Sequence, residues 1–110
     1  MRAIRIDHHK RTVYAVELEP GAVLRGLQAA VGGCIEPAGD LPGANVLYVN
    51  EEGLLRRPER LFVLRGWTAQ PLAGSGIIVG EDPEGETVPA DLSVADVWAR
   101  LVFLERGRDW

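Results

Sequence analysis

Two stretches at the start of the chain alternate apolar and polar residues, which is the pattern of a half-buried β-strand. The first runs from Arg2 to Asp7 and the second from Thr12 to Leu18. The polar stretch between them, residues 7–11, has the character of a turn. We therefore predict an N-terminal β-hairpin.

A helical pattern follows the hairpin. Pro20 stands where the first turn of a helix would lie. The apolar residues after it recur at intervals that place them on one side of a helix: Val23, Leu24, Leu27, Ala30 and Val31. Gly32 and Gly33 come next, and one of them is expected to adopt the left-handed conformation that ends many helices. The pattern predicts an amphipathic helix over residues 21–31 that packs on a sheet.

Three further apolar runs predict strands. Cys34–Glu36 is short and is stopped by Pro37. Asn45–Val49 is apolar at consecutive positions, as in an inner strand covered on both faces. Gly76–Gly80 is a β-branched run bounded by glycines. The stretch from Glu81 to Ala90 between this run and the C-terminal segment is acidic and predicts a mobile loop.

Two segments nearer the C-terminus are interpreted as helices. Leu61–Leu64 fits either a strand or a short helix that begins at Pro58, and we favour the helix. Ser93 to Asp96 resembles a capping box with Asp in place of the usual Glu. The apolar residues after it lie at helical spacing and predict a helix that continues to Glu105: Val94, Val97, Trp98, Leu101 and Leu104.

The resulting element order predicts an α+β fold. We expect a mostly antiparallel sheet of about five strands, with two or three helices packed largely on one face. A length of 110 residues fits one domain, residues 1–110, and 46% hydrophobic residues suffice for a small core. No apolar run approaches the roughly 18 residues of a membrane span, so no membrane partner is expected.

The N-terminus and the cysteine usage indicate the cellular compartment. The first residues, Met1 to Asp7, carry charges and do not resemble a signal peptide. The single cysteine, Cys34, excludes a disulfide framework and fits a reducing cytoplasm. Cys34 precedes a predicted strand residue, which favours a plain buried thiol over a reactive one.

Charge is distributed unevenly along the chain. The net charge of −4 argues weakly against non-specific binding of DNA or RNA. Four arginines and one acid, Glu59, lie between Leu54 and Gly66, whereas six acids and no base lie between Glu81 and Asp96. This asymmetry indicates either a local anion-binding surface or two solvated faces of opposite sign.

A helix that ends in Val31-Gly32-Gly33, followed by Ile35-Glu36 and later by Asn50-Glu51-Glu52-Gly53, resembles a small uncharacterised domain family of bacteriophages and other mobile elements. The resemblance covers about Ile4 to Gly80. Pro58 is followed here by Glu59, where that family commonly has asparagine after the proline. The resemblance implies a phage or mobile-element origin and carries no activity and no catalytic residue.

Catalytic and metal-binding patterns are weak. Ser75 lies in a Gly-rich loop and Ser93 caps a helix, so neither has the surroundings of a nucleophile. Glu51 and Glu52 are adjacent and would point to opposite sides of a strand end. Asp7, His8 and His9 have the chemistry of metal ligands, but adjacent side chains in a turn rarely converge on one ion. We expect no enzyme, no cofactor and no metal.

A binding site is the better interpretation of the middle of the chain. Polar residues at the end of a buried strand are followed by arginines, whose planar forks match phosphate oxygens, and by an aromatic ring that can stack on a base. We predict that these residues bind a ligand: Asn50, Glu51, Arg56, Arg57, Arg60 and Trp67. The alternatives are that Trp67 and Tyr48 belong to the core and that Asn50 stabilises a turn.

Three functions are compatible with these patterns. The preferred one is an accessory protein in the host cytoplasm, acting as a homo-oligomer, that sequesters a small anionic, nucleotide-like signal of host defence without turnover. The second is an inhibitor that binds a host protein through the acidic stretch. The third is a small hydrolase.

Overall fold

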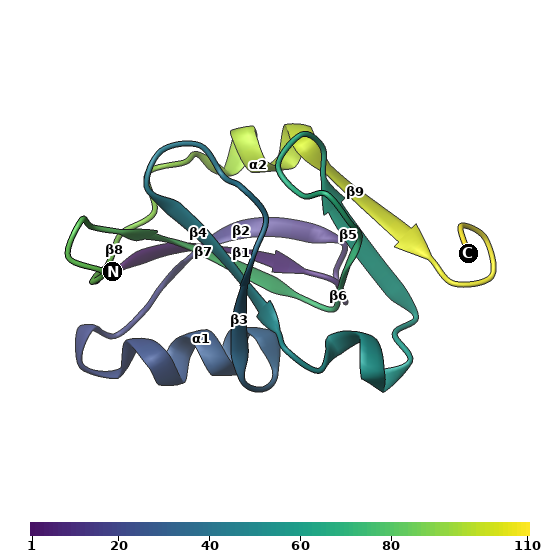
Figure 1. Cartoon of the computed structure of the whole chain (residues 1–110), viewed down its shortest axis with the longest axis horizontal. Coiled ribbons are helices and arrows are strands. Elements are labelled where there is room, and N and C mark those ends of the chain that lie inside the picture. The colour runs from purple at the N-terminus through teal and green to yellow at the C-terminus, as the bar shows by residue number, and fades with distance from the viewer.

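A computed structural model describes all of residues 1–110, and its main element is a six-stranded antiparallel sheet. Five strands lie in the order β2-β1-β7-β4-β3, and the short β8 pairs with the end of β7. Their bounds are β1 (Arg2–Asp7), β2 (Thr12–Glu17), β3 (Ile35–Ala38), β4 (Asn45–Asn50), β7 (Gly76–Glu81) and β8 (Thr87–Val88) (Figure 1). The N-terminal hairpin and the strand over residues 76–80 are confirmed, and β4 is an inner strand as expected.

A second, three-stranded antiparallel sheet has the order β6-β5-β9. Its strands are β5 (Arg60–Leu64), β6 (Leu72–Ala73) and β9 (Leu101–Glu105). The helices are α1 (Val23–Val31), which follows the 3-10 turn η1 (Pro20–Ala22), and α2 (Val94–Arg100); a second 3-10 turn is η2 (Gly53–Arg56). The α+β class and the antiparallel pairing are confirmed, whereas nine strands in two sheets replace the expected five or so. None of the helices combines the length and the apolarity that a membrane crossing needs.

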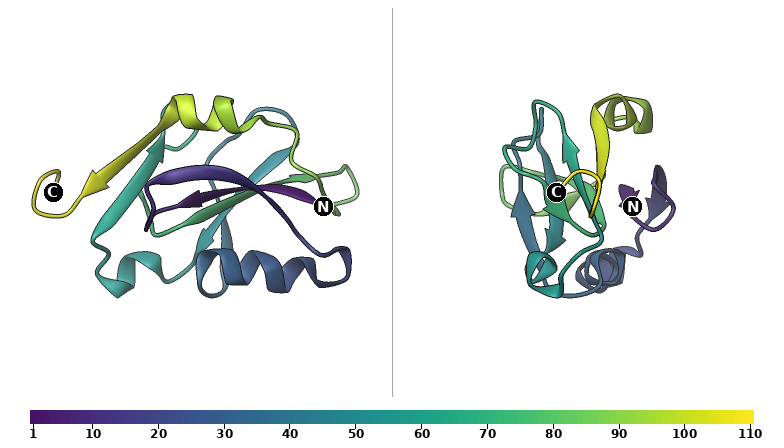
Figure 2. Two further views of the ribbon diagram at one scale, coloured as in Figure 1. Left: turned by 180° about the vertical axis from the view of Figure 1, so that it is seen from behind. Right: turned by 90° about the vertical axis from the view of Figure 1, so that its right-hand side faces the viewer.

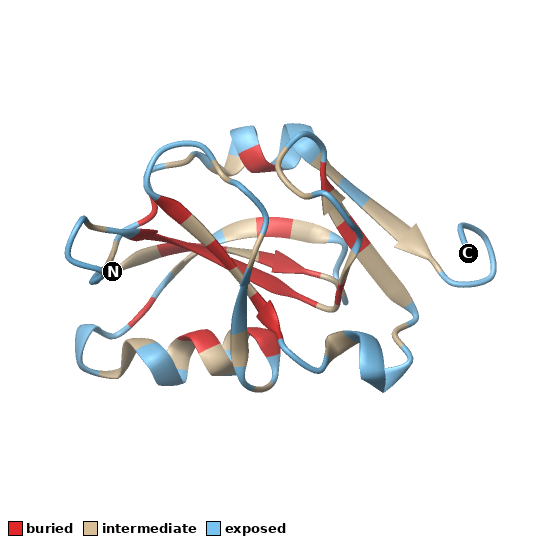
Figure 3. Ribbon diagram, in the orientation of Figure 1, coloured by how far each residue is buried: buried red, intermediate tan, exposed pale blue.

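The two faces of the larger sheet contribute to two different cores, because successive side chains of a strand point to opposite faces. One face packs on α1 through Leu27 and Val31. The other packs on the smaller sheet and on Val97 of α2. The buried residues therefore concentrate in the central strands, with single stripes on the helices (Figure 3).

The helices consequently lie on opposite sides of the strands and not largely on one face (Figure 2). Helical periodicity gives each helix an apolar stripe, but it does not say which face of the sheet that stripe will cover. The second sheet, which the sequence interpretation lacked, takes the place opposite α1.

The helix predicted for Leu61–Leu64 is wrong, because this segment is strand β5. Phe62 and Leu64 are fully buried, while Leu61 and Val63 are only partly covered. Burial thus alternates from one residue to the next, as it does in a strand. Leu61 pairs with both Leu104 of β9 and Ala73 of β6, so backbone pairing on both sides holds the segment extended.

The C-terminal helix ends at Arg100 and not at Glu105. Ser93 caps its start as predicted, since its hydroxyl accepts a hydrogen bond from the Asp96 N–H at 3.0 Å. Leu101 has an extended backbone, with φ −77° and ψ 130°, and begins β9. Residues 101–105 pair with β5 along their whole length, and this pairing outweighs the helical spacing of Leu101 and Leu104.

The prediction of a buried Cys34 is wrong as well, because its thiol is exposed. Cys34 lies between α1 and β3, in the connection that begins after Val31. Its side chain therefore lies outside the core, whereas that of the next residue, Ile35, packs against the core beneath α1.

One of the two glycines after α1 was expected to adopt the left-handed conformation, and Gly32 does so, with φ 81°. Its N–H donates to the carbonyl of Gln28 at 2.8 Å. Gly32→Ala is expected to lower the free energy of unfolding by about 1–2 kcal/mol, because a Cβ is strained at this φ. Urea denaturation measures the change. Gly21→Ala is the control, since Gly21 has no positive φ and open space around it, and an equal loss in both variants would contradict the prediction.

Candidate functional site

Strand register brings three polar residues together at one end of the larger sheet. Gly76, the first residue of β7, pairs with Ile6 of β1 on one side and with Val49 of β4 on the other. The residue before it, Ser75, therefore lies between the end of β1 and the end of β4. Those ends carry His8, directly after β1, and Asn50.

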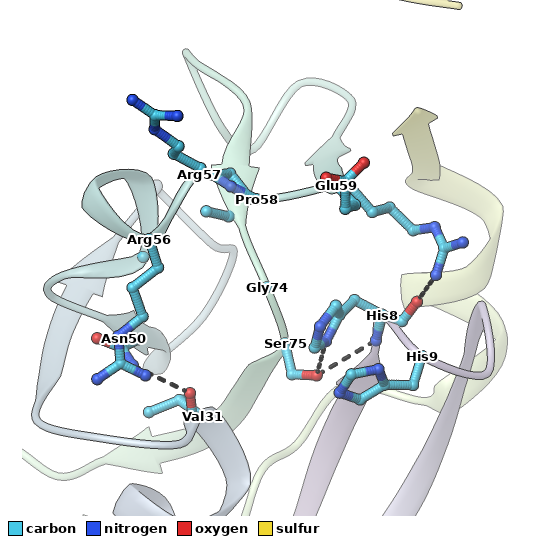
Figure 4. A pocket seen from close by; sticks show the side chains of 13 residues that line it. His8, His9, Val31, Asn50, Arg56, Arg57, Pro58, Glu59, Gly74 and Ser75 are labelled. Carbon is cyan, nitrogen blue, oxygen red and sulfur yellow. Dashed lines mark hydrogen bonds between the residues drawn. The ribbon is translucent and has the colours of Figure 1, made fainter. Parts of the chain in front are cut away.

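A cleft of about 590 Å³ opens at this end of the sheet (Figure 4). It lies between the β1–β2 turn, the end of α1, the segment from η2 to β5, and the turn that connects β6 to β7. The residues that line it are His8, His9, Val31, Asn50, Gly53, Arg56, Arg57, Pro58, Glu59, Arg60, Ala73, Gly74 and Ser75. Three arginines and two histidines thus share the cleft with a single carboxylate, that of Glu59.

His8 and Ser75 contact each other in the cleft wall. The Ser75 hydroxyl oxygen accepts a hydrogen bond from the His8 backbone N–H at 3.2 Å and lies 2.6 Å from Nδ1 of the His8 ring. The ring of His9 packs against that of His8, with centroids 3.8 Å apart. Ser75 is 3% exposed, so the His8 ring is held in place by a buried side chain.

The surroundings of His8 lower its pKa below the ordinary value of 6.5. Burial is the largest cause, and positive charge on His9, Arg60 and Arg5 acts in the same direction. The carboxylate of Asp7 opposes them. These surroundings therefore favour the neutral imidazole of His8 at neutral pH.

Asp7 organises the turn that carries both histidines. Its Oδ1 accepts the N–H groups of His9 at 3.0 Å and Lys10 at 3.1 Å. Its Oδ2 accepts from Arg5 at 3.2 Å and from the hydroxyl of Tyr14 at 3.1 Å. Burial alone would raise the pKa of Asp7, but these hydrogen bonds and the charge of Arg5 outweigh it and lower the pKa below 3.8.

Asp7→Asn is expected to lower the free energy of unfolding at pH 7 by about 1–3 kcal/mol, because the charge-assisted hydrogen bonds to the turn are lost. The pKa of Asp7 is lower in the folded chain than its ordinary 3.8, so its contribution is fully present above about pH 4. The contribution disappears as the pH falls through the folded-state pKa. The wild type should therefore lose more stability than the variant between pH 4 and pH 2.

Urea denaturation at several pH values measures this difference. Asp40→Asn serves as the control, since Asp40 is an exposed carboxylate and a surface substitution usually changes stability by less than about 0.5 kcal/mol. Parallel pH profiles for the wild type and Asp7→Asn would show that Asp7 does not stabilise the turn through its charge.

Arg60 joins the second sheet to the histidine turn. Its Nε donates to Glu105 of β9 at 2.5 Å, and its Nη1 donates to the carbonyl of His8. Glu105 also pairs with Arg11 at 3.1 Å. The hydrogen bond from Arg60 is the main reason why the pKa of Glu105 lies below its ordinary value. Arg60 therefore positions the histidine turn at the edge of the cleft, but Glu105 already balances much of its charge.

The other two arginines lie on the opposite wall. Arg56, the last residue of η2, donates to the carbonyl of Gly32 at the end of α1, at 3.3 Å. Its side chain extends along the cleft towards Asn50 (Figure 4). Arg57 borders the cleft, but its guanidinium points outward (Figure 4). Both side chains are exposed, so both remain accessible to a dissolved ligand.

The six predicted ligand-binding residues separate into two groups. Asn50, Arg56, Arg57 and Arg60 all line the cleft, whereas Glu51 and Trp67 do not. Glu51 is exposed beside the strand end. Trp67 is partly buried against the core between the sheets, and the guanidinium of Arg100 lies 4.5 Å from its ring centroid.

Asn50 has a structural role whatever the cleft binds. Its side-chain amide donates to the carbonyl of Val31 at 3.4 Å, and its oxygen accepts from the Glu52 N–H at 2.8 Å. It thereby ties the end of α1 to the end of β4 and forms the turn that leads into η2. This is the alternative role that the sequence left open.

His8, His9 and Ser75 belong to the cleft but were not among the predicted binding residues. The sequence separates Ser75 from His8 by 67 positions, so no local motif could have joined them. Only a prediction of which strands pair could have identified these residues. A strand over residues 76–80 next to one over residues 2–7 would have placed the two residues side by side.

No group of three or more histidine, cysteine or acidic side chains converges as a metal site. The acidic stretch is partly engaged in structure. Asp82 accepts the N–H groups of Glu84 and Glu86 at 3.0 and 2.9 Å, and the Asp91 N–H donates to Asn45 at 3.1 Å. Part of this stretch, β8, is a strand and not a mobile loop.

Residues 1–101 match a family described as Domain of unknown function (DUF3846). The chain belongs to this family. The match includes the whole larger sheet and both helices, and it stops at the first residue of β9. No curated protein and no solved structure matches the chain. Membership of an uncharacterised family is therefore confirmed, while its link to bacteriophages stays a prediction.

Proposed function

We propose that the cleft binds and retains a small anionic, nucleotide-like molecule without changing it chemically. One observation carries the proposal: a protein with a net charge of −4 gathers three arginines and two histidines around one cleft that holds a single carboxylate. A cluster of this sign on an acidic chain raises the local concentration of anions.

The size and the chemistry of the cleft support this ligand class. A volume of about 590 Å³ lies within the range of roughly 300–1,000 Å³ that is usual for small-molecule sites. Guanidinium groups recognise phosphate and carboxylate oxygens with paired hydrogen bonds. Arg56 is exposed and reaches along the cleft, which makes it the principal contact in the proposal.

The biological setting in the proposal comes from the sequence resemblance. A bacteriophage or mobile element would use such a protein in the host cytoplasm to sequester a nucleotide-like signal of host defence. Sequestration favours slow release, and a homo-oligomer could close the open side of the cleft with a second chain. We include both features as part of the proposal.

Isothermal titration calorimetry with a panel of linear and cyclic nucleotides tests the proposal. At least one member is expected to bind with a dissociation constant below about 100 μM, which corresponds to more than about 5 kcal/mol. The ligand recovered from the complex should be chemically unchanged. Heats no larger than those of ligand dilution across the whole panel would refute anion binding as the function.

Hydrolysis is the second candidate, and the contact between Ser75 and His8 favours it. A hydroxyl 2.6 Å from an imidazole nitrogen has the spacing of a nucleophile and its general base. In such a reaction the oxygen of Ser75 would bond to the carbonyl carbon or phosphorus of the substrate, its proton would pass to His8, and the bond to the leaving group would break as His8 returned that proton to it; water would then cleave the Ser75 ester and restore the hydroxyl. Product formation from a nucleotide or an ester that Ser75→Ala abolishes would establish this candidate in place of simple retention.

A further inference from the structure

The two histidines form the wall of the cleft that faces Arg56 (Figure 4). They are the only histidines in the chain. His8 is held by Ser75 through two contacts, one to its backbone and one to its ring. The imidazole of His8 is thus held in place in a cleft lined by cations. If it takes up a proton, it becomes an imidazolium that can pair with a bound anion.

We propose that His8 becomes an imidazolium when the cleft binds the terminal phosphate of its ligand, so that binding takes up a proton. The inference rests on the proposed anion binding and deepens it. It names the ligand class as molecules that carry a dianionic terminal phosphate, and it adds His8 and Ser75 to the binding residues.

The hydrogen bond between His8 and Ser75 can persist in both states. In the neutral tautomer that carries its proton on Nε2, the Ser75 oxygen accepts the His8 backbone N–H, and its hydroxyl proton is donated to Nδ1. In the charged state, Nδ1 carries the proton and donates it to Ser75. The Ser75 oxygen then accepts two hydrogen bonds, which uses both of its lone pairs.

Protonation of His8 thereby frees the hydroxyl proton of Ser75. This proton can then be donated to an anion in the cleft, together with the N–H at Nε2 of His8. One proton taken from solvent consequently supplies a positive charge and releases an additional hydrogen-bond donor. Hydrogen bonds between ionised partners are shorter and stronger than those between neutral ones.

The charges around His8 favour the neutral state until an anion arrives. Burial disfavours a positive charge on the ring most, and neighbouring His9, Arg60 of β5 and Arg5 of β1 act in the same direction. Asp7 favours the charge, but it is already bonded to Arg5 and to the turn. Glu105 acts through Arg60, which it partly balances, and Glu59 lines the same cleft.

A dianion in the cleft reverses this balance. An opposite charge within about 4–6 Å of a titrating group shifts its pKa by roughly 1–3 towards the charged form. A terminal phosphate carries nearly two charges at neutral pH, whereas a phosphodiester carries one. The proposal therefore predicts a preference for terminal phosphates over cyclic phosphodiesters of the same nucleoside.

Proton NMR of the imidazole groups tests the inference. The chain has only two histidines, and both line the cleft, so every imidazole signal reports on it. His8→Gln and His9→Gln assign them. The probes are AMP, which has a terminal phosphate, cyclic AMP, which has a phosphodiester, and sulfate, which stays dianionic throughout the titration. Saturating AMP or sulfate is expected to raise the pKa of His8 by about one pH unit or more, and cyclic AMP to raise it less.

Variants separate binding from proton uptake. Ser75→Ala should weaken AMP binding about tenfold, because a hydrogen bond to a charged group is lost. It should also change the response of the His8 signal to AMP. Arg25→Gln is the matched control, since Arg25 is an exposed arginine on α1 outside the cleft, and AMP binding should change less than twofold.

The outcomes distinguish this inference from the proposed function. A raised pKa of His8 with AMP supports both. AMP binding that leaves the pKa of His8 unchanged, or tighter binding of cyclic AMP than of AMP, overturns the inference and leaves anion binding intact. Absence of binding by all three probes, and by every member of the nucleotide panel, overturns both.

Discussion

Phe62→Ala is expected to lower the free energy of unfolding by about 3–5 kcal/mol. Phe62 is fully buried between the two sheets, where its ring fills the space above Gly76. A Cβ on Gly76 would lie 3.0 Å from the tip of the Phe62 ring, so the ring packs directly against the backbone of the larger sheet. Truncation removes this contact and leaves a cavity between the sheets.

Chemical denaturation at equilibrium measures the loss. Val102→Ala is the control, because Val102 is on the neighbouring strand β9 but 36% exposed, and its truncation should cost less than about 1 kcal/mol. A loss of similar size in the two variants would mean that the smaller sheet does not pack on the larger one. Since small domains have only about 5–15 kcal/mol of stability in total, Phe62→Ala should also be visibly less heat-stable.

Arg56→Glu is expected to weaken the binding of pyrophosphate about a hundredfold, or by about 2.8 kcal/mol. The substitution places a negative charge on the cleft wall where a guanidinium now extends towards Asn50. Like charges across a binding site cost several kcal/mol when they are brought close together. Calorimetry at constant ionic strength measures the change.

Arg57→Glu is the matched comparison, because it makes the same change of charge one residue further along the chain. The side chain of Arg57 points outward, so its effect should act only through the general field and remain below about tenfold. Raising the salt concentration should reduce the effect of Arg57→Glu more than that of Arg56→Glu. Equal effects of the two variants would place the ligand outside the cleft.

The sequence predicted local features well because they depend on short-range geometry. The hairpin, the left-handed Gly32 and the cap at Ser93 all follow from turn and helix-end preferences that a few residues satisfy alone. The four cleft residues from Asn50 to Arg60 were also within reach, since they are close together in the sequence. Their charge pattern indicated either an anion-binding surface or two solvated faces of opposite sign.

The smaller sheet could not be predicted in the same way. β5 and β9 hold each other extended across 36 intervening residues, and each segment alone also fits a helical spacing. If the segment of β5 is interpreted as a helix, the segment of β9 has no strand to pair with and is also interpreted as a helix. The first wrong assignment therefore leads to the second. Without a second sheet to cover one face of the larger sheet, the helices were expected largely on a single face, which was not specified.

The histidine wall was missed for a related reason. His8 and Ser75 meet only because β7 lies between β1 and β4, and strand order is not encoded in the periodicity of any one strand. For Trp67 the sequence left two roles open, stacking on a base or packing in the core. Tertiary packing places it against the core, beside Arg100 and outside the cleft.

The pairing of Arg60 with Glu105 bears on the charge of the cleft. Glu105 lies on the last strand, beyond residues 1–101, which match the family, and it partly balances a cation at the edge of the cleft. Without this carboxylate, the guanidinium of Arg60 would be uncompensated and the cleft would attract more highly charged anions. A strand that contributes no residue to the cleft lining can thus set how strongly the cleft discriminates between ligands of different charge.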